Sequence, residues 1–162
     1  MSSTTAEFDK QLQADVNAMA RITTELGWVT HRQQAQRLKS FDLTVPQFMT
    51  MRALDQIGQA CTMSELAEAA LQVSATITGI INRLEERSLV ERLLNPADRR
   101  SFRVSLTAAG LSLLDDIAQQ KRSRLQTYLS HLPVEKRQEL LGLLATYLQA
   151  MTADLDEAEQ DN

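Results

Sequence analysis

Apolar residues recur at spacings of three and four near the start of the chain, and this pattern predicts one long helix over residues 7–39. They form a narrow seam over about three heptads, at Phe8, Leu12, Val16, Met19, Ile22, Leu26 and Val29. A similar series predicts a last helix over residues 134–155, at Leu140, Leu144, Tyr147, Met151 and Leu155. A seam as long as the first needs a partner helix, either from the same chain or from a second copy.

Length and composition fit one mainly helical domain. The chain has 162 residues, of which 43% are apolar and 23% are charged, so it can form a core. Five glycines, three prolines and 4% aromatic residues are few for a β-sandwich or barrel. A single cysteine excludes a disulfide framework and a multi-thiolate zinc site, and we expect no bound metal. The N-terminus is polar and no apolar run reaches about 18 residues, so we expect a cytoplasmic protein without a membrane span.

Three N-cap residues predict three successive helices in the middle of the chain. Two of them open capping boxes, in which Gln or Glu follows Thr after three residues. The predicted helices cover residues 45–57, 63–70 and 75–87, behind the N-caps Thr44, Thr62 and Ser74. A short connection separates the last two, which is typical of a helix-turn-helix.

Two short strands and a charged loop follow these helices. Residues 89–94 and 102–106 have strand character, and the second strand alternates apolar and polar side chains. The polar segment 95–101 joins them into a hairpin with a charged tip. Thr107 then caps a helix that runs to about Leu129. This order predicts a mainly α fold, a winged helix-turn-helix with long helices at both ends.

The helix predicted over residues 75–87 has two contrasting faces. On a helical wheel one side is apolar, with Ile77, Ile80, Ile81 and Leu84. The opposite side is small or hydrogen-bonding, with Ala75, Gly79, Asn82 and Glu86, flanked by Thr76, Thr78 and Arg83. A face of this shape fits the DNA major groove, which accepts one helix. It also fits a second helix of the same protein, and the wheel leaves both interpretations open.

Charge is distributed unevenly along the chain. The whole sequence has a formal charge of −4, whereas residues 72–106 carry six arginines, no lysine and four acidic residues. Arginine is the side chain suited to bidentate contacts with phosphates and bases. Arg99 or Arg100 at the hairpin tip could enter a minor groove, with Asp98 pairing with an arginine and fixing its direction. An exposed, solvated turn would have the same composition.

Five segments in this order resemble the MarR family of winged helix-turn-helix transcription regulators. They are Leu43-Thr44-Val45-Pro46-Gln47-Phe48, Met63-Ser64-Glu65-Leu66-Ala67, Ile81-Asn82-Arg83-Leu84-Glu85, Asn95-Pro96-Ala97-Asp98-Arg99-Arg100-Ser101 and Ser105-Leu106-Thr107-Ala108-Ala109-Gly110. The resemblance covers about residues 10–155. It implies a homodimer whose N- and C-terminal helices interlock, a palindromic operator in double-stranded DNA, repression, and release by a small ligand or an oxidant.

The resemblance also implies roles for regions and residues. Residues 44–106 would form the DNA-binding region, and residues 1–43 and 107–162 the helical dimerisation region. The recognition helix would be residues 74–87, with the DNA-facing side chains Ser74, Thr76, Thr78, Asn82 and Arg83. On the wing, Arg99 or Arg100 would make the contact and Asp98 would orient it.

A candidate ligand site lies late in the first helix. Trp28, His31 and Arg32 combine an aromatic ring with cationic groups, which suits a small aromatic acid. The resemblance implies such a site, because the family often binds phenolic compounds between the dimer helices and the DNA-binding region. Alternatively, Trp28 serves packing and the other two are solvated or hold the dimer together. Cys61 is either an inert apolar residue or a redox switch.

An enzyme is not expected. The two histidines, His31 and His131, are far apart in the sequence, and neither has a nearby carboxylate motif. No glycine-rich phosphate loop, zinc-ligand spacing or nucleophile elbow occurs, so we expect no catalytic residues and no cofactor. One non-enzymatic alternative to a DNA-binding regulator stays open, a helical protein-interaction module that uses the winged-helix surface to bind a protein.

Overall fold

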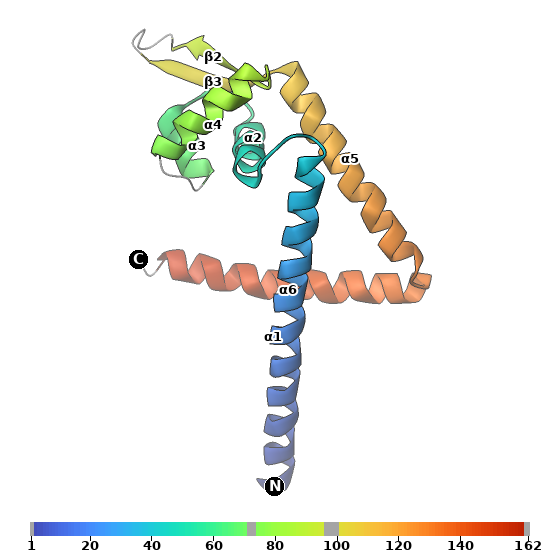
Figure 1. The fold of residues 1–162 in the computed structure, drawn as a ribbon. Coiled ribbons are helices and arrows are strands. Elements are labelled where there is room, and N and C mark those ends of the chain that lie inside the picture. The colour runs from blue at the N-terminus through green and yellow to red at the C-terminus, as the bar shows by residue number, and fades with distance from the viewer. Residues whose placement is uncertain (1, 71–73, 96–100, 161–162) are drawn as a thin grey trace. The chain divides into compact units, whose positions relative to one another are not determined.

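The computed structural model describes residues 2–70, 74–95 and 101–160, and the side chains of residues 8–70, 76–95 and 101–153. The chain divides into two compact units, residues 1–117 and residues 118–162. Its elements, all of which except β1 are labelled in Figure 1, are α1 (Ser2–Lys39), α2 (Val45–Ile57), β1 (Cys61–Thr62), α3 (Met63–Ala69), α4 (Ser74–Glu86), β2 (Val90–Leu94), β3 (Phe102–Leu106), α5 (Ala108–Ser130) and α6 (Val134–Gln160). This succession confirms the predicted winged helix-turn-helix. Within the described ranges, no helix is long and apolar enough to cross a membrane.

α1 is one uninterrupted helix that begins at Ser2, earlier than the apolar pattern predicts. Its seam is exposed in the single chain: the exposed fraction is at least 50% at Phe8, Leu12, Val16, Ile22, Leu26 and Val29. Its last turn joins the core of the first unit through Leu38, which is 1% exposed. Most of the α1 seam is therefore uncovered, as expected of a helix that needs a partner.

The N-caps of α2 and α3 form as their sequences predict. Thr44 Oγ1 accepts a hydrogen bond from the Gln47 backbone N–H, and the Gln47 side chain accepts one from the Thr44 backbone N–H. Thr62 and Glu65 make the same reciprocal pair at the start of α3. α2 ends at Ile57 and is capped by Gly58, whose φ of 70° lies in the left-handed region that favours glycine.

The wing is a three-stranded antiparallel sheet in the order β1–β3–β2. β2 and β3 pair along their whole length, with Arg92 opposite Val104 at the centre, which confirms the predicted hairpin. β1 pairs with the other edge of β3, where Cys61 lies opposite Val104. A strand of two residues is too short for an alternating pattern to predict, so the third strand is an addition to the sequence-based fold.

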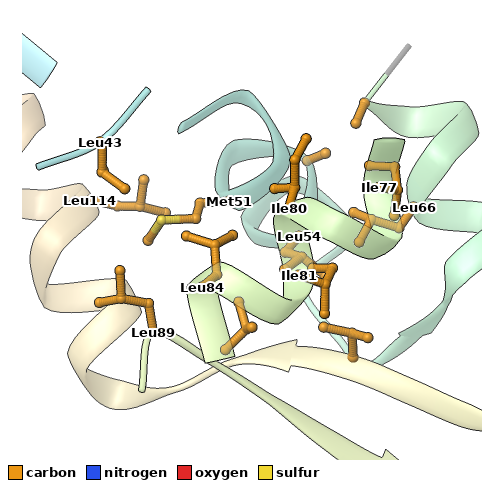
Figure 2. Close-up of a cluster of buried hydrophobic side chains, with 14 of the residues drawn as sticks. Leu43, Met51, Leu54, Leu66, Ile77, Ile80, Ile81, Leu84, Leu89 and Leu114 are labelled. Carbon is orange, nitrogen blue, oxygen red and sulfur yellow. The ribbon is translucent and has the colours of Figure 1, made fainter. Parts of the chain in front are cut away.

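The apolar side of α4 is the centre of the core in the first unit (Figure 2). Ile77, Ile81 and Leu84 are 0% exposed and Ile80 is 7% exposed. They lie among residues from α2, α3, the α4–β2 connection and α5, such as Met51, Leu54, Leu66, Leu89 and Leu114. Because this side is fully buried, the opposite side of α4 is directed away from the core.

Besides its buried apolar side, α4 is held at its C-terminal end by an arginine side chain. Arg87, which directly follows the helix, donates through Nη1 to the carbonyl oxygen of Asp42 at 2.6 Å and through Nη2 to that of Phe41 at 2.9 Å. Both carbonyls belong to the segment between α1 and α2. This arginine therefore connects the end of α4 to the end of α1.

The second unit contains the end of α5 and all of α6. α6 continues to Gln160, beyond the predicted end at residue 155. Its large apolar side chains are exposed between 38% and 49% at Leu140, Leu144, Tyr147 and Met151. α6, like α1, leaves its apolar residues accessible.

Candidate nucleic-acid interface

α4 carries the predicted polar residues on the side that faces away from the core. Thr76, Thr78, Gly79, Asn82 and Arg83 are all exposed, and we call this surface the α4 outer face. Ser74 is the first residue of the helix, but its side chain lies outside the described residues. The helix period thus brings four of the five predicted DNA-facing helix residues to one accessible side.

Gly79 lies near the middle of the α4 outer face. A Cβ atom built on it would meet nothing within 4 Å. Glycine in a helix interior costs about 1 kcal/mol relative to alanine, and no contact among the described residues requires it here. Packing of this small face on another helix of the same chain, one of the two interpretations of the wheel, is therefore absent from the described part of the molecule.

An arginine from the wing holds one edge of the α4 outer face. Arg92 on β2 donates through Nη1 to the Glu85 carboxylate at 2.6 Å and through Nη2 to Asn82 Oδ1 at 2.5 Å. The exposed fraction of the Arg92 side chain is 28%. The sequence pattern gives Arg92 no role of its own. The available signal was the short distance in sequence between Arg92 and the acidic Glu85-Glu86 pair, whose charge attracts a cation.

The tip of the wing lies outside the described residues, and with it Asp98, Arg99 and Arg100, whose roles stay predictions. The two ends of the tip are described and contact each other. The Asn95 backbone N–H donates to the Ser101 carbonyl oxygen at 3.1 Å, and Asn95 Nδ2 donates to Ser101 Oγ at 2.9 Å. These two bonds join the ends of the segment that connects β2 to β3.

Known transcription regulators match the part of the sequence that forms the central helices and the wing. The sequence profile of the MarR family matches residues 43–102, from the start of α2 into the wing. The HTH-type transcriptional repressor NicR of Pseudomonas putida is 37% identical over 102 residues, which are 63% of this chain and 64% of NicR. The matched region is that of a MarR-family winged helix-turn-helix regulator. The match nevertheless spans less than two thirds of the length of NicR.

Solved structures share the winged-helix fold of this chain. A point mutant of Staphylococcus aureus MepR has a TM-score of 0.75 at 22% identity, covering 82% of this chain and 97% of MepR. A second MepR point mutant, in a structure bound to an oligodeoxyribonucleotide, has a TM-score of 0.69 at 22% identity, covering 82% and 96%. At this identity the likeness shows the fold alone. NicR and the MarR-family profile are those of transcription regulators, which agrees with the prediction that the chain is not an enzyme.

The candidate ligand residues lie on α1. A surface depression of about 400 Å³ is lined by Thr23, Thr24, Gly27, Trp28 and His31. Trp28 is 74% exposed, so its indole ring is accessible in the single chain. Arg32 is exposed but does not line this depression. The structure therefore brings Trp28 and His31 together and leaves Arg32 beside them.

Cys61 is buried in β1, with an exposed fraction of 2%. Burial raises the pKa of its thiol above the ordinary value of 9.0, and the negative charge of Glu65 raises it further. A raised pKa keeps the thiol protonated at neutral pH, and the thiolate is the reactive form. The role of an inert apolar residue is therefore favoured over that of a redox switch. Among the described residues, no group of three or more His, Cys, Asp or Glu could hold a metal ion.

Proposed function

We propose that this chain is a DNA-binding regulator of transcription of the MarR family, acting as a repressor in the cytoplasm. The observation that carries this proposal is the α4 outer face, a small and polar surface on a helix whose other side is fully buried. Such a helix can enter a major groove without rearrangement. The description of NicR as a repressor and the DNA-bound structure of a MepR mutant support the same function.

In the proposed complex, residues 44–106 bind double-stranded DNA. α4 lies in the major groove, with its DNA-facing side chains at Ser74, Thr76, Thr78, Asn82 and Arg83. Hydroxyl and arginine side chains contact phosphates and position the helix, whereas an amide can read a base edge. The wing reaches the neighbouring minor groove, where Arg99 or Arg100 makes the contact and Asp98 orients it.

We propose that residues 1–43 and 107–162 form a homodimer. The apolar seams of α1 and α6 are exposed in the single chain, and burial of one such side chain contributes about 1.5–3 kcal/mol. A twofold dimer would present two copies of α4 to successive major grooves, roughly 34 Å apart, and so select a palindromic operator. Sedimentation at micromolar concentration should show a dimer, and a stable monomer would contradict this part of the proposal.

We further propose that a small aromatic acid lowers operator affinity by binding on α1. The exposed Trp28 ring offers a stacking surface, Arg32 offers a positive charge for a carboxylate, and His31 can donate a hydrogen bond to it. A panel of aromatic acids should contain members that raise the melting temperature and weaken DNA binding. If Trp28→Ala and wild-type protein respond identically to those acids, this site is wrong.

The deciding experiment selects bound sequences from randomised duplexes and measures their affinity by fluorescence anisotropy at several salt concentrations. We expect one palindromic sequence, with log K falling linearly as log salt rises. Arg100→Ala should weaken operator binding without changing the melting temperature. Arg52→Ala is the matched control, because Arg52 lies on α2 in an exposed pair with Asp55. Binding to a protein but not to DNA would instead support the interaction module.

The role of Asn82 is tested with the same duplexes. Asn82→Ala should cost about 1–3 kcal/mol of discrimination at one base pair if its amide reads a base edge. An equal loss on every sequence, including random DNA, would reassign Asn82 to a phosphate contact.

A further inference from the structure

We propose that Arg92 is a positioning residue for base recognition, which fixes the amide of Asn82 so that its Nδ2–H2 group is offered to DNA. This role rests on the proposed DNA-binding function and deepens it. It specifies which chemical class of base edge the α4 outer face accepts.

The amide atom that faces Arg92 is determined by chemistry. A guanidinium group has donors and no acceptor, so the amide atom in contact with it must be the oxygen. Arg92 Nη2 accordingly donates to Asn82 Oδ1 at 2.5 Å. The other amide atom, Nδ2, carries two donors and lies on the opposite branch of the planar amide. Asn82 is exposed, so these donors are accessible on the α4 outer face.

Arg92 itself is held from two directions. Its backbone lies in the middle of β2, opposite Val104, which is 0% exposed. Its Nη1 donates to the Glu85 carboxylate at 2.6 Å while Nη2 holds Asn82, so the planar fork bridges two neighbouring residues of α4. The amide orientation is therefore set before DNA binds, which reduces the ordering cost of recognition.

A fixed donor discriminates among bases in the major groove. Guanine offers N7 and O6 as acceptors, adenine offers N7 and thymine offers O4, whereas cytosine offers only its N4 amino donor. A free asparagine can turn its oxygen toward cytosine. An amide held by Arg92 would have to break that hydrogen bond first. The base under Asn82 should therefore carry an acceptor, and cytosine on the contacted strand should be rejected.

The experiment measures base preference at one operator position. The position under Asn82 is identified as the one whose preference is lost in Asn82→Ala. Wild-type affinity is then measured on four duplexes that differ only at this base pair, in both half-sites. We expect wild type to bind the cytosine duplex at least about fivefold more weakly than the best one.

Two variants release the amide in different ways. Arg92→Gln removes the guanidinium group, and Glu85→Gln weakens the ion pair that holds Arg92 in place. Each should reduce the discrimination against cytosine to about twofold or less, with base preferences elsewhere in the operator unchanged. Arg92→Lys keeps the charge but lacks the planar guanidinium group, so it should retain only part of the wild-type discrimination against cytosine. Arg52→Gln, which breaks an arginine–carboxylate pair on α2, should behave as wild type.

The outcomes separate positioning from other roles. In the Asn82→Ala background, Arg92→Gln should have no further effect on base preference, because Arg92 acts through Asn82. A uniform loss of affinity on all four duplexes with a weaker salt dependence would make Arg92 a phosphate contact and overturn the proposal. Unchanged rejection of cytosine by both Glu85→Gln and Arg92→Gln would also overturn the proposal. If Arg92→Gln fails to fold, the result for Glu85→Gln alone decides whether the proposal stands. Failure of wild type to select any sequence refutes the proposed function instead.

Discussion

Replacing Gly79 with alanine tests whether the α4 outer face is uncovered in the protein and closely approached by DNA. Gly79 lies in the interior of α4, its φ is outside the left-handed region, and an added Cβ would meet nothing within 4 Å. Alanine is favoured over glycine in a helix interior by about 0.5–1 kcal/mol. We therefore expect the free energy of unfolding to rise by about this amount, which corresponds to roughly 1–4 °C in melting temperature for a chain of this size.

DNA affinity should change in the opposite direction. A methyl group on a helix face that lies against base edges must be accommodated in a tight contact, and overpacking costs about 1–3 kcal/mol. Urea denaturation and fluorescence anisotropy on the same preparation measure the two effects separately. Gln56→Ala, at an exposed position of α2, is the control and should leave operator affinity unchanged.

Two results would refute this reasoning. Lower stability of Gly79→Ala would mean that the α4 outer face is covered in the folded protein. Higher stability with unchanged operator affinity would mean that DNA does not approach Gly79.

Three further predictions concern other sites. Gly110→Ala should lower the free energy of unfolding by at least about 1–3 kcal/mol in urea denaturation, because its Cβ would lie 2.2 Å from the Leu89 carbonyl oxygen. A hydrogen bond from the Thr62 backbone, and a second from its side chain, lower the pKa of the Glu65 carboxyl below its ordinary value of 4.5. The carboxylate therefore stabilises the fold above pH 4.5. This stabilisation is lost as the pH falls through the pKa of Glu65 in the folded protein. Unfolding curves of wild type and Glu65→Gln should therefore converge in acid, and a constant difference would contradict this. Native Cys61 should resist iodoacetamide in mass spectrometry and react after unfolding, whereas fast native labelling would show that it is accessible.

Most of the fold was predictable because its signals are local. The capping boxes that begin at Thr44 and Thr62 each involve residues three apart, and both form as expected. The apolar side of α4 follows from the helix period and is buried as predicted. The start of α1 at Ser2 was not predictable, because the polar residues before residue 7 carry no apolar periodicity.

The candidate site was predictable only in part. The helix period identified which side chains share the α4 outer face, but the contact between Arg92 and Asn82 joins a strand to a helix and exists only in the folded chain. Charge alone did not distinguish Arg92 from Arg87, which donates to the carbonyl oxygens of Phe41 and Asp42. Counting arginines between residues 72 and 106 therefore overestimates how many are available to DNA.

The acidic net charge of the chain is a weak argument against DNA binding. Residues 107–162 carry five basic and nine acidic side chains, which accounts for the whole formal charge of −4. Interactions between exposed charges are largely screened beyond about 10 Å at 0.1 M salt, so net charge alone does not fix the potential at a phosphate. Near the α4 outer face, the Glu85 carboxylate is already paired with Arg92. If the proposed function is right, the charges within that distance of α4 and the wing should determine the affinity for DNA, and one substitution tests each of them.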